Sequence, residues 1–84
     1  MYEVRILRRA MRDILRLPRE DARRVSIRID ALSATPRPPG VRKLRGAEGL
    51  FRLRVGDYRI LYEVDDAAQV VTVYRVRHRR EAYR

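Results

Sequence analysis

The sequence predicts an α+β fold in a single domain over residues 1–84, with two helices on one face of a mainly antiparallel sheet. Three observations support this fold class. Apolar and polar residues alternate near the N-terminus, a stretch with helical spacing follows, and alternation returns in the C-terminal half, with turn residues between the runs. The expected order is an N-terminal strand, an antiparallel two-helix hairpin and a three-stranded antiparallel meander. The second face of the sheet should remain uncovered.

The N-terminal strand and the first helix follow directly from the residue pattern. Residues 2–7 alternate as a strand does. Residues 8–17 have helical spacing, and Pro18 should end this helix because proline has no amide hydrogen and its ring clashes with the preceding turn. The apolar residues at helical spacing are Met11, Ile14 and Leu15.

A second helix is predicted over residues 19–34, packed on the core by one apolar face. Its opposite face contains Arg23, Arg24 and Arg28, which we interpret as a solvated surface. The two helices meet at Pro18 and should form an antiparallel hairpin. The apolar stripe of the second helix consists of Ala22, Val25, Ile29 and Leu32.

The C-terminal half predicts three strands joined by short turns. Residues 35–40 contain three of the chain's prolines and a glycine, so they cannot continue a helix and should form an extended connector. Gly56-Asp57 is a two-residue hairpin signal, and residues 65–68 should close the second hairpin. The expected strands are residues 49–55, 58–64 and 69–76.

Arginines alternate with apolar residues along the first predicted hairpin. Side chains point to alternate faces of a strand, so Arg52 and Arg54 should share one face and the apolar residues the other. In the next strand, Arg59 and Glu63 should lie on one face. If the apolar faces of both strands meet the core, three guanidinium groups converge on the open face. Such a cluster is typical of a site for phosphate groups.

Composition excludes several classes of protein. The net charge is +10, from 21 basic against 11 acidic residues, which favours a polyanionic partner. The absence of cysteine excludes disulfides and a thiolate nucleophile, and a single histidine argues against a structural zinc site. We expect no metal and no cofactor. With no long apolar run and no signal-peptide pattern, we expect a cytoplasmic protein that does not bind membranes.

Four motifs follow one another towards the C-terminus. They are Lys43-Leu44-Arg45-Gly46, Leu50-Phe51-Arg52-Leu53-Arg54, Gly56-Asp57-Tyr58-Arg59-Ile60-Leu61-Tyr62-Glu63-Val64, and His78-Arg79 with Glu81-Ala82-Tyr83. This series resembles the RelE toxins of bacterial type II toxin–antitoxin modules, and the resemblance covers essentially the whole chain. The gyrase-directed ParE toxins share the fold and much of the hairpin. The ending Arg-x-Glu-x-Tyr is more similar to the RelE branch.

The resemblance implies an activity and a set of residues. RelE toxins cleave messenger RNA in the ribosomal A site, through attack of a ribose 2′-hydroxyl on the adjacent phosphate. Fixed guanidinium groups can stabilise the charge that gathers on the phosphorane oxygens. The resemblance places Arg52, Arg54, Arg59 and Arg79 at the basic catalytic positions and Tyr83 at the tyrosine that stacks on a base or orients the 2′-hydroxyl. Further RNA-binding residues are expected at Lys43, Arg45, Arg77 and Arg80.

The general base is left open by the sequence. Some members of the family have lysines where this chain has Arg52 and Arg54, and arginine stays protonated, so neither is a suitable proton acceptor. The candidates are His78, Glu63 and Tyr83. His78 has the most suitable intrinsic pKa and is taken as the tentative base.

The resemblance also implies partners. A cognate antitoxin should neutralise the toxin by wrapping around it, either in the cleft near Arg52, Arg54 and Arg59 or by displacing the segment that contains Arg79 and Tyr83. The remaining expected partners are the ribosome with its messenger RNA, and operator DNA only through the antitoxin complex. Two alternatives remain open: a ParE-like toxin that inhibits DNA gyrase by binding, and an inactive toxin-fold protein that regulates its own operon.

Overall fold

The structure is a computed structural model of the chain and describes residues 1–46 and 49–80. Its helices and strands follow one another in the predicted order, with one additional short strand before the meander. The elements are β1 (Glu3–Ile6), α1 (Arg8–Leu15), α2 (Arg19–Ala31), β2 (Arg42–Lys43), β3 (Leu50–Val55), β4 (Tyr58–Asp65) and β5 (Val70–His78).

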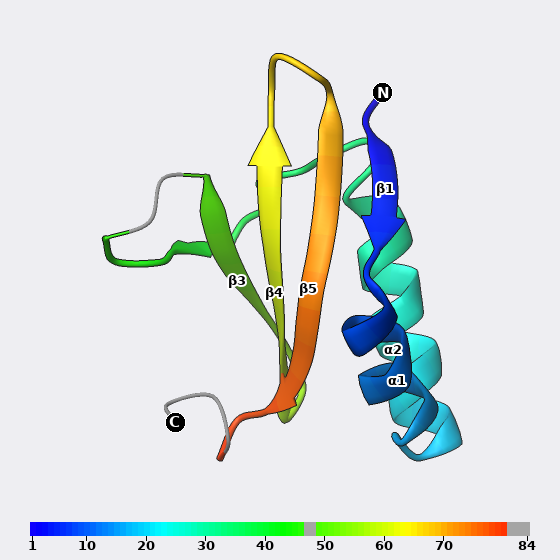
Figure 1. The fold of residues 1–84 in the computed structure, drawn as a ribbon. Helices are drawn as coiled ribbons and strands as arrows, with labels where there is room; N and C mark the ends of the chain where they lie inside the picture. Colours follow the sequence, from blue (N-terminus) through cyan, green and yellow to red (C-terminus); the bar gives the residue numbers. More distant parts are fainter. Residues whose placement is uncertain (47–48, 81–84) are drawn as a thin grey trace.

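The strands form one sheet in the order β1-β5-β4-β3-β2, and the helices lie together on one side of it (Figure 1). The antiparallel meander β3–β4–β5 is confirmed. Two features of the sheet were not predicted. β1 pairs in parallel with β5, so the N-terminal strand lies beside the last strand, and the short β2 pairs with β3 at the opposite edge.

Helix α1 is shorter than predicted and buries a different set of residues. It ends at Leu15 rather than at residue 17, because the residue before a proline is disfavoured in the helical conformation. Its buried side chains are Ala10 and Ile14. Met11 and Leu15 are exposed, so only one of the three apolar residues at helical spacing lies in the core.

Helix α2 confirms the predicted apolar stripe. Val25, Ile29 and Leu32 are buried, and Ala22 is partly buried against them. The helix ends at Ala31, three residues before the predicted end, and the amides that follow donate to carbonyls three residues back in a tightened last turn. No helix in residues 1–46 and 49–80 is long and apolar enough to cross a membrane.

The proline-rich connector closes the core on the side of β4. Tyr62 is fully buried, and its hydroxyl donates to the carbonyl of Pro36 at 2.7 Å. Burial raises the pKa of Tyr62 to about 12. The next residue, Arg37, lies over the ring of Phe51 at 5.3 Å and forms an ion pair with Asp66 at 2.7 Å. These contacts hold the connector against the sheet.

Helix α1 takes the place of β1 along the second half of β5. β1 pairs with β5 only as far as Val73, so the later part of β5 has a strand partner, β4, on one edge only. Asp13 of α1 accepts a hydrogen bond from the amide of Val76 at 2.9 Å and forms an ion pair with Arg75 at 2.8 Å. Burial acts to raise the pKa of Asp13, but these donors outweigh it and hold the pKa below its usual range. The carboxylate therefore fixes the end of β5 that precedes the C-terminal arginines.

Candidate functional site

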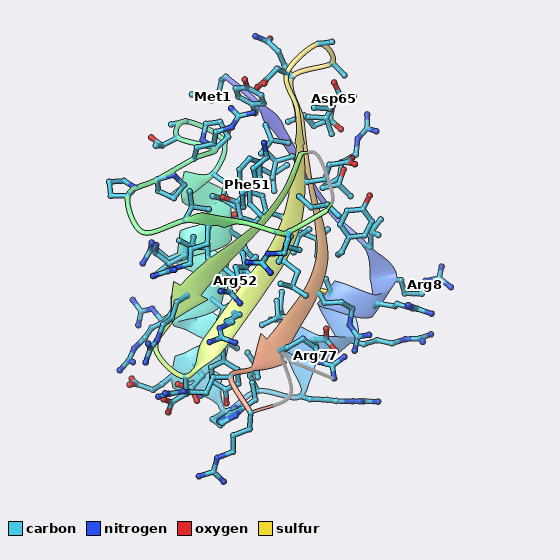
Figure 2. All side chains as sticks on the ribbon, turned by 90° about the vertical axis from the view of Figure 1, so that its left-hand side faces the viewer. Met1, Arg8, Phe51, Arg52, Asp65 and Arg77 are labelled. Atoms are coloured by element: carbon cyan, nitrogen blue, oxygen red, sulfur yellow. The ribbon has the colours of Figure 1, made fainter. Side chains whose placement is uncertain are left out.

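Three arginines form a row across the open face of the sheet. Arg54 of β3 is the cross-strand partner of Arg59 of β4, which is in turn the partner of Arg77 of β5. Paired residues in a sheet point to the same face, and neighbouring strands lie about 4.7–4.9 Å apart. The predicted alternation is confirmed, because every second residue is buried and the residues between are not; the buried ones are Phe51, Leu53 and Val55 of β3 and Ile60, Tyr62 and Val64 of β4. Figure 2, viewed from that open side, labels Arg52 and Arg77 on it.

A β-bulge in β5 brings Arg77 into this row. Leu61 pairs with Arg75, whereas Tyr62 pairs with Val73, so Tyr74 is an extra residue in the strand. The buried residues of β5 therefore change parity along the strand. They are Val71, Val73 and Val76.

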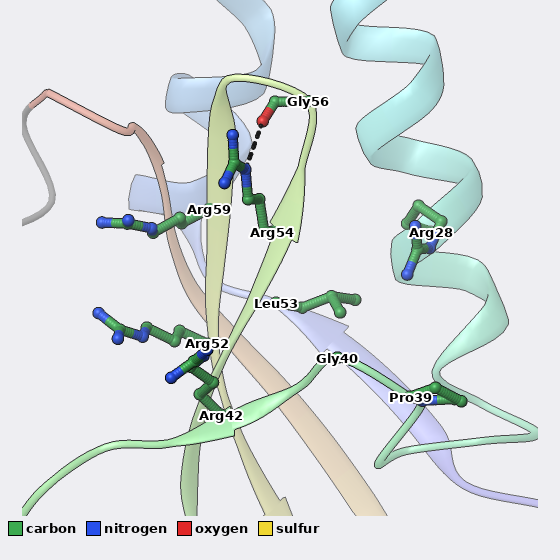
Figure 3. A pocket seen from close by; sticks show the side chains of 9 residues that line it. All are labelled: Arg28, Pro39, Gly40, Arg42, Arg52, Leu53, Arg54, Gly56 and Arg59. Atoms are coloured by element: carbon green, nitrogen blue, oxygen red, sulfur yellow. Dashed lines mark hydrogen bonds between the residues drawn. The ribbon is translucent and has the colours of Figure 1, made fainter.

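The hairpin turn orients Arg54. Gly56 has a φ of 60°, in the left-handed region that a two-residue hairpin turn requires and that glycine adopts without steric cost. The Nε of Arg54 donates to the Gly56 carbonyl at 3.2 Å (Figure 3). This bond holds the guanidinium near the turn, beside Arg59.

An open groove of about 770 Å³ lies against the row (Figure 3). Gly40 and Gly56, which have no side chain, form part of its wall. No carboxylate is among its lining residues in the described part of the chain, and five arginines are. The groove is suited to a polyanion. Its arginines are Arg28, Arg42, Arg52, Arg54 and Arg59.

Two of these arginines were missed by sequence reasoning. Arg42 is the partner of Arg52 through β2, a strand of two residues that is too short to show an alternation. Arg28 belongs to α2 and was assigned to a solvated helix face, but it is half-buried and lines the groove from the side opposite the sheet. Its position three residues after the buried Val25 was the available signal that it borders the core.

The two basic residues predicted before the hairpin do not line the groove. Lys43 pairs with Phe51, a buried residue, and so points to the opposite side of β2 from Arg42. Arg45 is exposed in the segment between β2 and β3. Both side chains are exposed.

The start of the C-terminal tail is tied to the end of the sheet where the arginine row lies. The amide of Arg79 donates to the carbonyl of Asp57, in the β3–β4 turn, at 2.7 Å. A second hollow, of about 560 Å³, is lined by these two residues together with His78 and Arg80. The predicted Arg79 and Arg80 therefore adjoin the turn that orients Arg54.

His78 lies on the helix side of the sheet. It pairs with Tyr58, and the two rings meet edge to face with centroids 5.3 Å apart. The Tyr58 hydroxyl donates to Asp21 of α2 at 3.4 Å, which marks this side as the one that faces the helices. The Nδ1 of His78 accepts a hydrogen bond from the amide of Arg80 at 3.2 Å. While this bond is formed, the lone pair of Nδ1 is occupied by the Arg80 amide.

The other two candidate bases differ in position. Glu63 follows Arg59 by four residues along β4, a distance of about 13 Å along an extended strand, so it does not adjoin the same phosphate. Tyr83 lies outside the described residues.

Comparison with known proteins identifies the family. The sequence profile described as "ParE toxin of type II toxin-antitoxin system, parDE" matches residues 4–83. The chain belongs to this toxin family. The chain is also 39% identical over 84 residues to Toxin RelG of Mycobacterium tuberculosis, covering 99% of this chain and 97% of that protein. The resemblance of the motifs to RelE toxins is thereby confirmed.

Solved structures of RelE toxins share the fold. The RelE–RelB complex of Pyrococcus horikoshii has a TM-score of 0.84 at 30% identity, covering 95% of this chain and 97% of that one. The toxin–antitoxin complex RelBE2 of Mycobacterium tuberculosis has a TM-score of 0.80 at 36% identity, covering 92% of this chain and 96% of that one. This toxin therefore has the RelE/ParE architecture.

Proposed function

We propose that this toxin is a ribosome-dependent endoribonuclease that cleaves messenger RNA in the ribosomal A site. The observation that supports it is the row of Arg54, Arg59 and Arg77, with the arginine-lined groove beside it. Like charges opposite one another destabilise a sheet. A fold that retains such a row is expected to use it, and a phosphodiester is the ligand that guanidinium groups bind through paired oxygens.

The proposed reaction is an internal phosphoryl transfer. The ribose 2′-oxygen loses its proton and forms a bond to the adjacent phosphorus, while the bond from phosphorus to the 5′-oxygen of the next nucleotide breaks and that oxygen takes up a proton. The products are a 2′,3′-cyclic phosphate and a free 5′-hydroxyl. Negative charge on the phosphorane oxygens is greatest in the transition state, so Arg59 and Arg79 stabilise it more than they stabilise the ground state.

Proton removal is the step for which the described residues are least equipped. Arg52 and Arg54 stay protonated and serve only to bind and neutralise the phosphate. We propose Tyr83 as the residue that orients the 2′-hydroxyl. Positioning of the messenger on the ribosome then accounts for much of the rate, because a correctly held nucleophile can lower a barrier by about 7–11 kcal/mol. This dependence on position explains why the cleavage requires ribosomes.

The proposed partners follow from the same assignment. The complexes of relatives are with RelB antitoxins, and we propose that a cognate antitoxin neutralises this chain too. Ribosome and messenger RNA are its targets, and operator DNA is bound only through the antitoxin complex.

A second candidate function is inhibition of DNA gyrase by binding, without RNA cleavage. The matching family profile is described as a ParE toxin, which favours this alternative. In that case the arginine groove binds an acidic surface of the topoisomerase, and no transition state is stabilised.

Toeprinting on translating ribosomes distinguishes the two. Purified toxin is added to ribosomes stalled on a defined message, and to the same message without ribosomes, and supercoiling by gyrase is assayed in parallel. We expect cuts in the A-site codon only when ribosomes are present, with gyrase unaffected. Gyrase inhibition with intact messages would instead establish the second candidate.

A further inference from the structure

Helix α1 exposes a row of apolar side chains that the fold leaves uncovered. Leu7, at its N-cap, is 40% exposed, Met11 42% and Leu15 77%. Residues spaced by four lie on one side of a helix, so the three form a continuous ridge next to the buried side of α1. Most apolar residues of the chain are in the core, which makes this ridge an exception that requires an explanation.

A row of arginines runs parallel to the apolar ridge. Arg8, Arg12 and Arg16 each follow a ridge residue by one position, and all three are exposed. Figure 2 shows Arg8 projecting outward from α1. Within residues 1–46 and 49–80, none of the three forms an ion pair. The surface of α1 thus has two adjacent rows, one apolar and one positive, each with a period of four residues.

The chemistry of the two rows indicates which kind of partner binds them. A nucleic acid would contact the arginines but would leave the apolar ridge uncovered. A second copy of this chain, with its net charge of +10, would bring arginine against arginine. An acidic amphipathic helix satisfies both rows, because its apolar stripe can pack on the ridge while carboxylates beside that stripe meet the arginines.

We propose that the two rows of α1 are the docking surface for an acidic amphipathic helix of the cognate antitoxin. This inference rests on the proposed partner. Desolvation of the ridge supplies most of the affinity, and the arginine row supplies orientation, since exposed ion pairs contribute little energy. None of the residues that line the arginine groove belongs to α1. Docking on α1 therefore leaves the groove open, and neutralisation requires another segment of the antitoxin.

A crosslinking experiment locates the docked helix. The chain has no cysteine, so a single cysteine can be introduced and labelled with a photocrosslinker. Leu15→Cys is the probe, and Ile27→Cys is the matched control, because Ile27 is an exposed aliphatic residue of α2, 57% accessible. With the protein encoded by the adjoining antitoxin gene, we expect a crosslink from position 15 and none from position 27. Equal crosslinking from both positions, or none from position 15, overturns the proposal.

Affinity measurements test the same surface without a label. Leu15→Asp should weaken antitoxin binding at least tenfold and Arg12→Glu should weaken it by a smaller factor, whereas Ile27→Asp should change it less than twofold. The milder Leu15→Ser should also weaken binding, and circular dichroism checks that every variant folds. Unchanged affinity in Leu15→Asp and Leu15→Ser overturns the docking surface.

The activity assay separates this proposal from the proposed function. Leu15→Asp should cleave messages on ribosomes as well as the unmodified toxin, because Leu15 lies outside the groove, but it should resist neutralisation. If the unmodified toxin fails to cleave while the affinity loss is observed, the proposed function is wrong and the docking surface stands. If the unmodified toxin cleaves messages but Leu15→Asp binds the antitoxin with unchanged affinity, the docking surface is wrong and the proposed function stands.

Discussion

Arg54 and Arg59 are direct cross-strand partners in the hairpin β3–β4, and both side chains lie on the open face of the sheet (Figure 3). Their backbones are held within a ladder whose opposite face is the hydrophobic core. The two guanidinium groups therefore cannot move far apart unless their side chains extend away from the sheet. The arrangement concentrates positive charge at one place on the sheet.

The first prediction is that this pair lowers stability and is needed for activity. Arg54→Thr removes the repulsion and places a residue of high β-propensity in the strand, so the free energy of unfolding should rise by about 0.2–1 kcal/mol. Cleavage on ribosomes should fall at the same time. Urea denaturation and toeprinting on one preparation measure both effects. A variant that is less stable than the original would mean that Arg54 has a structural role.

The second prediction separates chemistry from binding. Arg59→Ala and Arg79→Ala should each lower cleavage about 100- to 1,000-fold, the effect of losing one donor to a developing oxyanion. Association with ribosomes should weaken far less, because many other arginines remain to contact RNA. Arg23→Ala, on the exposed face of α2, is the control and should alter affinity and its salt dependence only. Similar losses of cleavage from Arg23 and Arg59 would argue against a localised active site.

The third prediction concerns the base. His78→Gln should reduce cleavage less than tenfold, because the imidazole packs on Tyr58 and its Nδ1 is occupied by the Arg80 amide. Tyr83→Phe should reduce cleavage by a larger factor, since it removes the hydroxyl proposed to orient the nucleophile. Single-turnover cleavage rates across a range of pH give both values. Loss of the acidic limb of the pH profile in His78→Gln would restore His78 as the base.

The fourth prediction is that Asp13 stabilises the end of β5. Asp13→Ala leaves the Val76 amide and the Arg75 guanidinium without this partner, which should lower the free energy of unfolding by about 1.5–3 kcal/mol. Glu3→Ala is the control, because the Glu3–Arg5 pair has side chains 62% and 60% exposed and should contribute much less to stability than Asp13 does. Equal effects from both substitutions would contradict the proposed role of Asp13.

The contribution of Asp13 should depend on pH in a definite direction. Its pKa is lower in the folded chain than in the unfolded one, so the added stability is complete above the unfolded value of about 3.9. It is lost as the pH falls through the lower, folded value. The difference in unfolding free energy between the original chain and Asp13→Ala should therefore shrink between pH 5 and pH 2. Other acidic groups are common to both proteins and cancel in this difference.

Local patterns in the sequence determined much of this fold. The alternation of β3 and β4, the Gly56-Asp57 turn and the stripe of α2 each depend on residues close together in the chain, where the period of the backbone alone decides which side chains share a face. The arginine face was predictable for the same reason. The stripe of α1 was not, because which apolar residues are covered depends on what packs against them, and Leu15 has no such neighbour.

Tertiary structure decided which residues belong to the site. Strict alternation after Val71 and Val73 would turn Arg77 towards the core and His78 to the open face. The bulge at Tyr74 reverses this, so that Arg77 joins the row and His78 packs on Tyr58. The alternation within a strand is a local property that a sequence can reveal. The register between strands depends on contacts between residues far apart in the chain, which also bring Arg28 and Arg42 to the groove.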